Sequence, residues 1–74
     1  MQLQVASFAS RENADRALAR LLAAGINDAS LSDVQSNGRV LWRLRVGAAD
    51  AARADELAGR IASLGFARPQ LVRE

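Results

Sequence analysis

Apolar and polar residues alternate in two short stretches of the chain, and each stretch leads into a segment with helical spacing. The first stretch is Leu3-Gln4-Val5, and the second is Leu44-Arg45-Val46. The helical segments that follow end at Gly25 and at Gly65. Alternation with a period of two predicts a half-buried strand, whereas the longer period predicts an amphipathic helix. We therefore interpret the chain as one strand–helix unit used twice.

The two predicted helices have matching apolar stripes and recognisable end signals. Ser10 and Asp50 are suited to accept hydrogen bonds from the first backbone N–H groups, so we expect them as N-caps. Gly25 suits the left-handed residue that follows many helices, and Gly65 ends the second helix. When these two glycines are aligned, three apolar pairs correspond: Ala14 with Ala54, Leu18 with Ala58, and Leu21 with Ile61.

Weaker signals predict two further strands. Residues 29–36 alternate imperfectly, which favours a bulge or an edge position. Asn37-Gly38 favours a two-residue turn that joins this strand to the next one. Residues 69–73 predict a short last strand, and Pro69 favours an edge because it has no N–H for the sheet ladder.

Together these elements predict one α+β domain over residues 1–74 with the order βαββαβ, a ferredoxin-like or RNP-like sandwich. Right-handed crossovers place the first and third strands in the middle of a four-stranded antiparallel sheet, with two helices on one face. The other face then stays open to solvent. Under the helices we expect Leu3, Val5, Val40, Leu44 and Val46.

The open face of the predicted sheet is the first place to look for function. One interpretation is an ordinary solvated surface on a one-sided sheet. The other is a shallow binding groove, because Gln both donates and accepts hydrogen bonds and Arg presents a rigid fork of donors that fits carboxylates and hydroxyls. Small Ala6 would leave room there for a ligand. The central strands would place on this face Gln2, Gln4 and Ala6 beside Leu41, Arg43 and Arg45.

The composition removes several kinds of chemistry. The 74 residues include no Cys and no His, so we expect no disulfide, no metal and no cofactor, and the usual general base is missing. Seven of the eight acidic side chains fall on predicted helices, loops and caps, and no nucleophile has a nearby base, which argues against an enzyme. The net charge is only +2, without a long basic run or an apolar stretch long enough to enter a membrane.

Nucleic acid is an alternative ligand, because RNA-recognition modules share this topology. Those modules stack bases on aromatic residues of the two central strands, where this chain has Gln, Leu and Arg. RNA or single-stranded DNA is therefore not the favoured ligand. A further alternative is a protein-interaction or dimerisation domain that uses the open face or an edge strand.

The positions of two aromatic residues bear on the groove. Trp42 shares the parity of Val40 and Leu44, which predicts a place under the helices or at their edge. Phe8 follows the first strand, where it either packs on the first helix or rims the groove.

Two segments of the chain resemble the SPOR (sporulation-related repeat) domain. Residues 3–8 (LQVASF) precede a helix that ends in Ala24-Gly25, and residues 42–47 (WRLRVG) precede a helix that ends in Leu64-Gly65. The resemblance covers nearly the whole chain. Residues 69–73 (PQLVR) further resemble the C-terminal SPOR domain of the rare lipoprotein A group.

The resemblance implies a non-catalytic module that binds peptidoglycan glycan strands denuded of stem peptides and targets its parent protein to the division septum. It implies a periplasmic location in the bacterial cell envelope, and any glycan-cleaving activity would belong to a separate domain. We expect a monomer that neither binds nucleic acid nor inserts into a membrane. The last strand could bring either Leu71 or Gln70 to the groove. The expected glycan-binding residues are Gln4, Ala6, Ser7, Phe8, Leu41, Arg43, Arg45 and Leu71.

Overall fold

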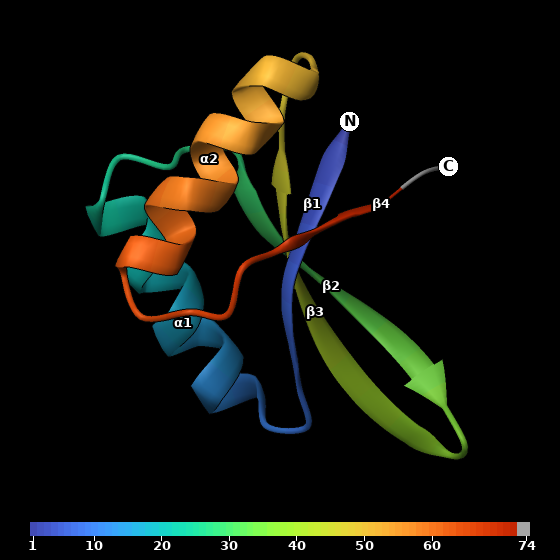
Figure 1. Cartoon of the computed structure of the whole chain (residues 1–74). Helices are drawn as coiled ribbons and strands as arrows, with labels where there is room; N and C mark the ends of the chain where they lie inside the picture. The colour runs from blue at the N-terminus through green and yellow to red at the C-terminus, as the bar shows by residue number, and fades with distance from the viewer. Residues whose placement is uncertain (73–74) are drawn as a thin grey trace.

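The computed structural model describes residues 1–72 and has the predicted βαββαβ order. Strands β1 (Gln2–Phe8), β2 (Ala29–Ser36), β3 (Arg39–Gly47) and β4 (Gln70–Val72) form one antiparallel sheet in the order β2-β3-β1-β4. β1 and β3 are therefore central, as predicted. Helices α1 (Arg11–Ala23) and α2 (Ala51–Ser63) pack on one side, and within residues 1–72 no helix covers the other side (Figure 1). Arg73, the last residue of the predicted fourth strand, lies outside the described residues.

The core lies between the two helices and the covered face of the sheet. Leu3 pairs with Val46 across β1 and β3, and both side chains are buried. The helical stripes pack against them, with Leu21 of α1 and Ile61 of α2 fully buried. Burial of an aliphatic side chain of this size contributes about 1.5–3 kcal/mol. The remaining core residues are Val5, Ala14, Ala17, Ile26, Leu44, Ala54, Leu57 and Ala58.

The predicted end signals of both helices are confirmed. The side chain of Ser10 accepts a hydrogen bond from the N–H of Asn13, and the side chain of Asp50 accepts one from Arg53 at 2.8 Å. After the helices, Gly25 and Gly65 have positive φ angles of 83° and 100°. Left-handed backbone of this kind favours glycine and lets the chain turn away from the helix.

Two arginines tie the C-terminal ends of the helices to each other. Arg20 of α1 donates a hydrogen bond to the carbonyl of Leu64 at the end of α2. Arg60 of α2 donates in return to the carbonyl of Ala24 at the end of α1, at 2.8 Å. The two arginines occupy the same position in the two repeats. A cation at a helix C-terminus satisfies a free carbonyl and opposes the negative end of the helix dipole.

Loss of either of these arginines should lower the stability of the domain. We expect Arg60→Met, which keeps the aliphatic stem, to cost about 1 kcal/mol, or roughly 4–8 °C in Tm for a domain of this size. Arg16→Met on the outer surface of α1 is the control, because the partner of Arg16 within residues 1–72 is the exposed carboxylate of Glu12. Thermal unfolding followed by circular dichroism measures both, and equal Tm values for the two variants would contradict a role for the helix-end contact.

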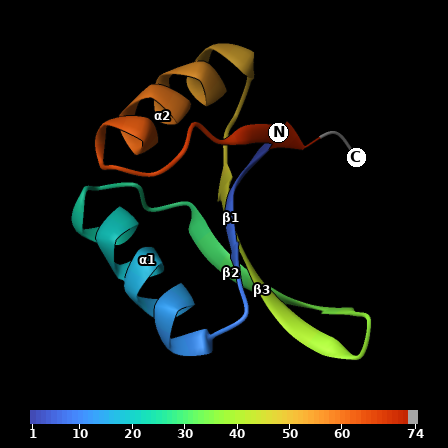
Figure 2. The same cartoon turned by 60° about the horizontal axis from the view of Figure 1, so that its bottom comes forward.

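The β2–β3 hairpin is longer than the helix layer. Its turn residues Asn37 and Gly38 have φ angles of 53° and 77°, as the predicted two-residue turn requires. β2 lies at an edge of the sheet and pairs with β3 without a register shift, so the edge prediction is confirmed for it. Figure 2 shows the hairpin extending away from both helices. For this reason Val40 is 42% exposed, and its predicted place in the core is wrong.

The irregularity of the sheet lies in β1. Gln4 pairs with Arg45, but the next paired residue of β1 is Ala6, opposite Leu44, so Val5 is the extra residue of a β-bulge. Val5 remains buried, and Ala6 also packs against the core. The bulge therefore reverses the alternation for the remainder of β1.

Candidate functional site

The open face carries a continuous set of polar side chains from all four strands. In its central row, Gln4 of β1 lies between Arg45 of β3 and Gln70 of β4. Arg45 is in turn paired with Ser30 of β2. Paired residues in an antiparallel sheet point to the same side, with neighbouring strands about 4.8 Å apart. This row is therefore a polar track across the whole sheet.

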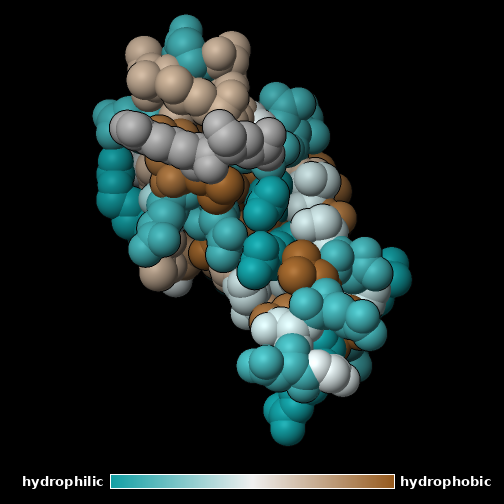
Figure 3. Space-filling model, turned by 90° about the vertical axis from the view of Figure 1, so that its right-hand side faces the viewer, coloured by the Kyte–Doolittle hydropathy of each residue, from teal (hydrophilic) through white to brown (hydrophobic). Residues whose placement is uncertain are grey.

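The bulge sets the second row of the face. Because it reverses the alternation of β1, Ser7 is paired with Arg43 and faces away from the helices. Arg43 is paired on its other side with Ser32. In Figure 3, hydrophilic side chains cover the middle of this face, with small apolar areas toward the hairpin. By its register on β3, Leu41 is an apolar residue of this face, half-buried opposite Val34.

The two central arginines have unused hydrogen-bonding capacity. Nη1 of Arg45 donates to Oε1 of Gln2 at 3.3 Å, which directs this guanidinium toward β1. The Nε atoms of Arg43 and Arg45 are buried, and within residues 1–72 neither has a hydrogen-bond partner. Because these Nε atoms are buried, a ligand on the open face would have to bind the terminal Nη groups of the two guanidinium groups, which carry the other four N–H donors of each arginine.

Arg43 and Arg45 differ from four other arginines of the chain in having no carboxylate partner among the described residues. Among the described residues neither Arg43 nor Arg45 has a carboxylate within ion-pair distance. Asp28 lies beside Gly47 at the far end of the face, without an ion pair to them. Their positive charge is therefore available to an anionic ligand. Four other arginines do have partners, in the pairs Arg11–Asp15, Arg16–Glu12, Arg53–Glu56 and Arg68–Asp55.

The structure corrects the predicted position of three residues. Ala6 is on the helix-covered side, because the bulge at Val5 turns it toward the core. Leu71 pairs with Leu3, so it also faces the helices. Phe8 is partly buried against the core and pairs with Trp42, so it packs on the helix side and does not rim the open face.

Trp42 lies at the edge of the helix layer, one of the two places that its parity allows. The guanidinium of Arg11, at the start of α1, lies 4.6 Å from the centre of its ring. Such a cation–π contact adds to the packing between the hairpin and the helix. Neither Trp42 nor Phe8 is therefore available on the open face.

Several open-face residues could not be found from alternation alone. The sequence pattern does not distinguish Gln70 from Leu71, and the place of Gln70 on the open face follows only from its pairing with Gln4. Ser30, Ser32 and Val34 belong to the strand with imperfect alternation, and their side becomes clear from their register with β3. The open face thus unites Gln4, Ser7, Leu41, Arg43 and Arg45 with Gln2, Gln70, Ser30, Ser32 and Val34.

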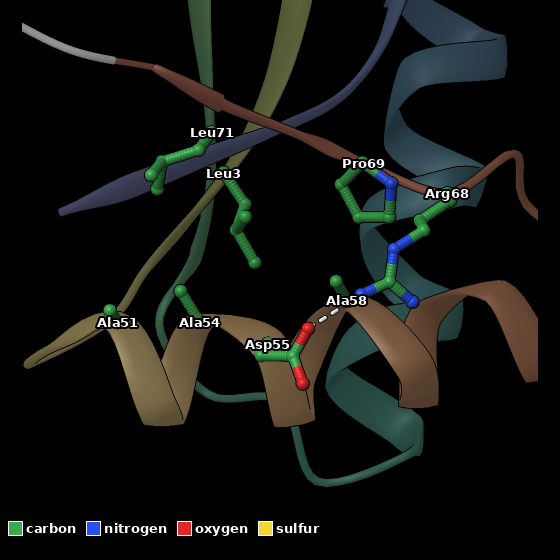
Figure 4. Close-up of a pocket in the computed structure, with 8 residues that line it drawn as sticks. All are labelled: Leu3, Ala51, Ala54, Asp55, Ala58, Arg68, Pro69 and Leu71. Carbon is green, nitrogen blue, oxygen red and sulfur yellow. Dashed lines mark hydrogen bonds and ion pairs between the residues drawn. The ribbon is translucent and has the colours of Figure 1, made fainter.

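A pocket of about 190 Å³ lies on the other side of the sheet, between α2 and the strands β1 and β4 (Figure 4). At its rim, Asp55 and Arg68 form an ion pair of 2.7 Å, so that their charges compensate each other. The lining holds no hydroxyl, thiol or imidazole that could act as a nucleophile or base. It is formed by Leu3, Ala51, Ala54, Asp55, Ala58, Arg68, Pro69 and Leu71.

Two further features concern the described part of the chain: a membrane-spanning helix and a cluster of metal-ligating side chains. Over residues 1–72 neither helix is long and apolar enough to span a bilayer. The same residues contain no cluster of three or more side chains of the Asp, Glu, His or Cys type that could hold a metal ion.

Fold and face together define a small α+β module that presents one polar, helix-free sheet surface. The family model of the SPOR domain matches residues 2–73, and the chain belongs to the SPOR domain family. A similar solved structure is the crystal structure of the RlpA SPOR domain from Pseudomonas aeruginosa. It is 31% identical, with a TM-score of 0.80, and the match covers 99% of this chain and 97% of that one. No curated protein matches the sequence.

Membership of this family gives the general function. SPOR domains are non-catalytic peptidoglycan-binding modules, so the chain is a binding module of this kind and not an enzyme. The resemblance seen in the two strand–helix segments is therefore confirmed.

Proposed function

We propose that this domain recognises peptidoglycan glycan strands denuded of stem peptides and targets its parent protein to the division septum from the periplasm. The observation that carries the proposal is the pair Arg43 and Arg45, which lie on an open face without a carboxylate partner within residues 1–72. The amides of Gln4 and Gln70 lie beside them.

The chemistry of a denuded strand matches this arrangement. Removal of the stem peptide leaves a free lactyl carboxylate, which an arginine can hold through two parallel hydrogen bonds. The acetamide groups of the sugars need a partner that both donates and accepts, which is what the side chain of Gln4 offers. An attached peptide would replace the charge with a neutral amide and add bulk, so selectivity for stripped strands follows.

The shape of the site suits a polymeric ligand. Polar residues extend across the four strands, from Ser30 to Gln70, and also along β3 through Arg45 and Arg43, so an extended chain can lie on this open face without entering a cavity. The residues that we assign to the glycan are Gln4, Ser7, Leu41, Arg43 and Arg45, with Gln70 in place of Leu71.

Nucleic acid fits this face less well. Base recognition by modules of this topology depends on stacking on exposed aromatic rings. Phe8 and Trp42 both face the helix side, and Phe66 packs against the core beneath Arg20. No aromatic side chain of residues 1–72 therefore lies on the open face.

Pull-down with purified sacculi tests the proposal. Wild-type protein should be retained more strongly after an amidase has removed the stem peptides. Arg43→Ala should lose most of this gain, whereas Gln4→Ala should lower retention on treated and untreated sacculi alike. The Tm of both variants should change little, because surface substitutions alter stability by about 0.5 kcal/mol. Retention that is unchanged by the amidase and by the substitutions would contradict the proposal. So would retention on homopolymeric RNA that is as strong as on treated sacculi and as sensitive to these substitutions.

A further inference from the structure

The open face continues along β3 beyond the helices. Because β2 and β3 pair without a register shift, every second residue of β3 is on the same side of the ladder. From the centre of the sheet toward the turn, these residues are Arg45, Arg43, Leu41 and Arg39. Three of the four positions are cationic, and the fourth is apolar.

Arg39 lies at the turn end of this row of β3 residues and, like Arg43 and Arg45, has no carboxylate partner among the described residues. It is exposed, it pairs with Ser36 next to the turn, and no carboxylate of residues 1–72 lies within ion-pair distance of it. The acidic residue of the hairpin, Asp33, pairs with Trp42 and so points to the other side. Arg39 is thus a third cation on the same surface.

The apolar area between Arg43 and Arg39 is formed by residues of both β2 and β3. Leu41 and Val34 are directly paired, and both are half-buried although they face away from the helices. A flat aliphatic patch between charged groups suits the C–H face of a sugar ring. The spacing also suits a polymer, since the six residue steps from Arg45 to Arg39 span about 20 Å of strand.

We propose that the glycan site extends along β3 onto the protruding hairpin. Arg39 then binds a second carboxylate of the same glycan strand, and Val34 and Leu41 contact the sugar that lies between the two carboxylates. This inference rests on the proposed function, and it names the direction and the minimum length of the ligand. A denuded strand carries one carboxylate per disaccharide, so only a strand of several disaccharides reaches both Arg43 and Arg39.

Binding measured against glycan length tests this extension. Denuded oligosaccharides of one, two, three and four disaccharides are titrated by calorimetry into wild type and into Arg39→Gln. We expect Arg39→Gln to bind the single disaccharide like wild type and to bind the longest strand about three- to fivefold more weakly, as for one exposed ion pair. Arg39→Lys, which keeps the charge, should recover most of the loss.

Arg16→Gln is the matched control, because it removes the same unit of charge from the outer surface of α1. It should leave the affinity unchanged at every length. An Arg39→Gln effect that is absent at all lengths, or equal at all lengths, would overturn the extension onto the hairpin while leaving the central site in place. Failure of wild type to bind any of the oligosaccharides would instead refute the proposed function itself.

Discussion

Conversion of the free carboxylates of a denuded glycan into neutral amides should weaken its binding to this domain about ten- to a hundredfold. The reason is the pair of guanidinium groups of Arg43 and Arg45, which can donate hydrogen bonds on the open face and have no carboxylate partner within residues 1–72. A carboxylate accepts these hydrogen bonds with a full charge, whereas a primary amide offers one neutral oxygen and adds two donors that face other donors. Calorimetric titration of the two forms of one oligosaccharide measures the difference.

Titrating both forms of the ligand, acid and amide, into arginine variants identifies the arginine that binds the carboxylate. In a double-mutant cycle, the variant that lacks the interacting group should no longer distinguish acid from amide. We expect this loss of discrimination for Arg43→Gln or Arg45→Gln. Gln4→Ala is the matched control, because it should bind both ligands more weakly but keep the preference for the acid. Equal affinity of wild type for the acid and the amide would show that the carboxylate does not cause the selectivity for denuded strands.

The same site should bind independently of pH over a wide range. The open face is formed by Arg, Gln, Ser and apolar residues, and the chain contains no His, the side chain that usually makes binding depend on pH near neutrality. The affinity should therefore stay level from about pH 5 to 9 and fall only as the ligand carboxylate is protonated, below about pH 4. Circular dichroism at each pH checks that the domain is still folded.

The order of the elements and the central pair of strands could be predicted because they depend on local signals. Hydrophobic periodicity, the caps Ser10 and Asp50, and the Asn37-Gly38 turn all act over a few residues. The parity of β3 follows the same rule, so the placement of Arg43 and Arg45 away from the helices needed no knowledge of tertiary contacts.

The course of β1 could not be predicted in the same way. The bulge at Val5 breaks the alternation, and it turns Ala6 toward the core and Ser7 toward the open face. Both side chains are small, so neither choice carries a clear hydrophobic signal. Ser7 entered the expected site through the resemblance to SPOR domains and not through periodicity.

Periodicity also could not predict which residues are buried at the edges of the sheet. β4 has three residues, and the choice between Gln70 and Leu71 depends on which of them meets Gln4 across the strands. Val40 has the parity of a core residue, but parity says nothing of where the helices stop. Both outcomes depend on long-range packing, which a local pattern does not contain.

Two valines of β3 should therefore respond very differently to the same substitution. Val46 and Val40 point to the same side of the strand, but Val46 is fully buried, whereas Val40 is 42% exposed. We expect Val46→Ala to cost about 2 kcal/mol, from the lost transfer of two methyl groups and the cavity that remains. This corresponds to a fall in Tm of roughly 8–16 °C for a domain of this size.

Val40→Ala should cost about 0.5 kcal/mol or less, because solvent already reaches this side chain and no cavity is created. Chemical denaturation of both variants gives the two free energies of unfolding, with wild type as the reference. A similar loss for the two would mean that the helix layer extends over the hairpin. In that case the hairpin would not extend beyond the helices on the Val40 side, although Arg39 and Leu41, which alternate with Val40 along β3, would keep their place on the open face.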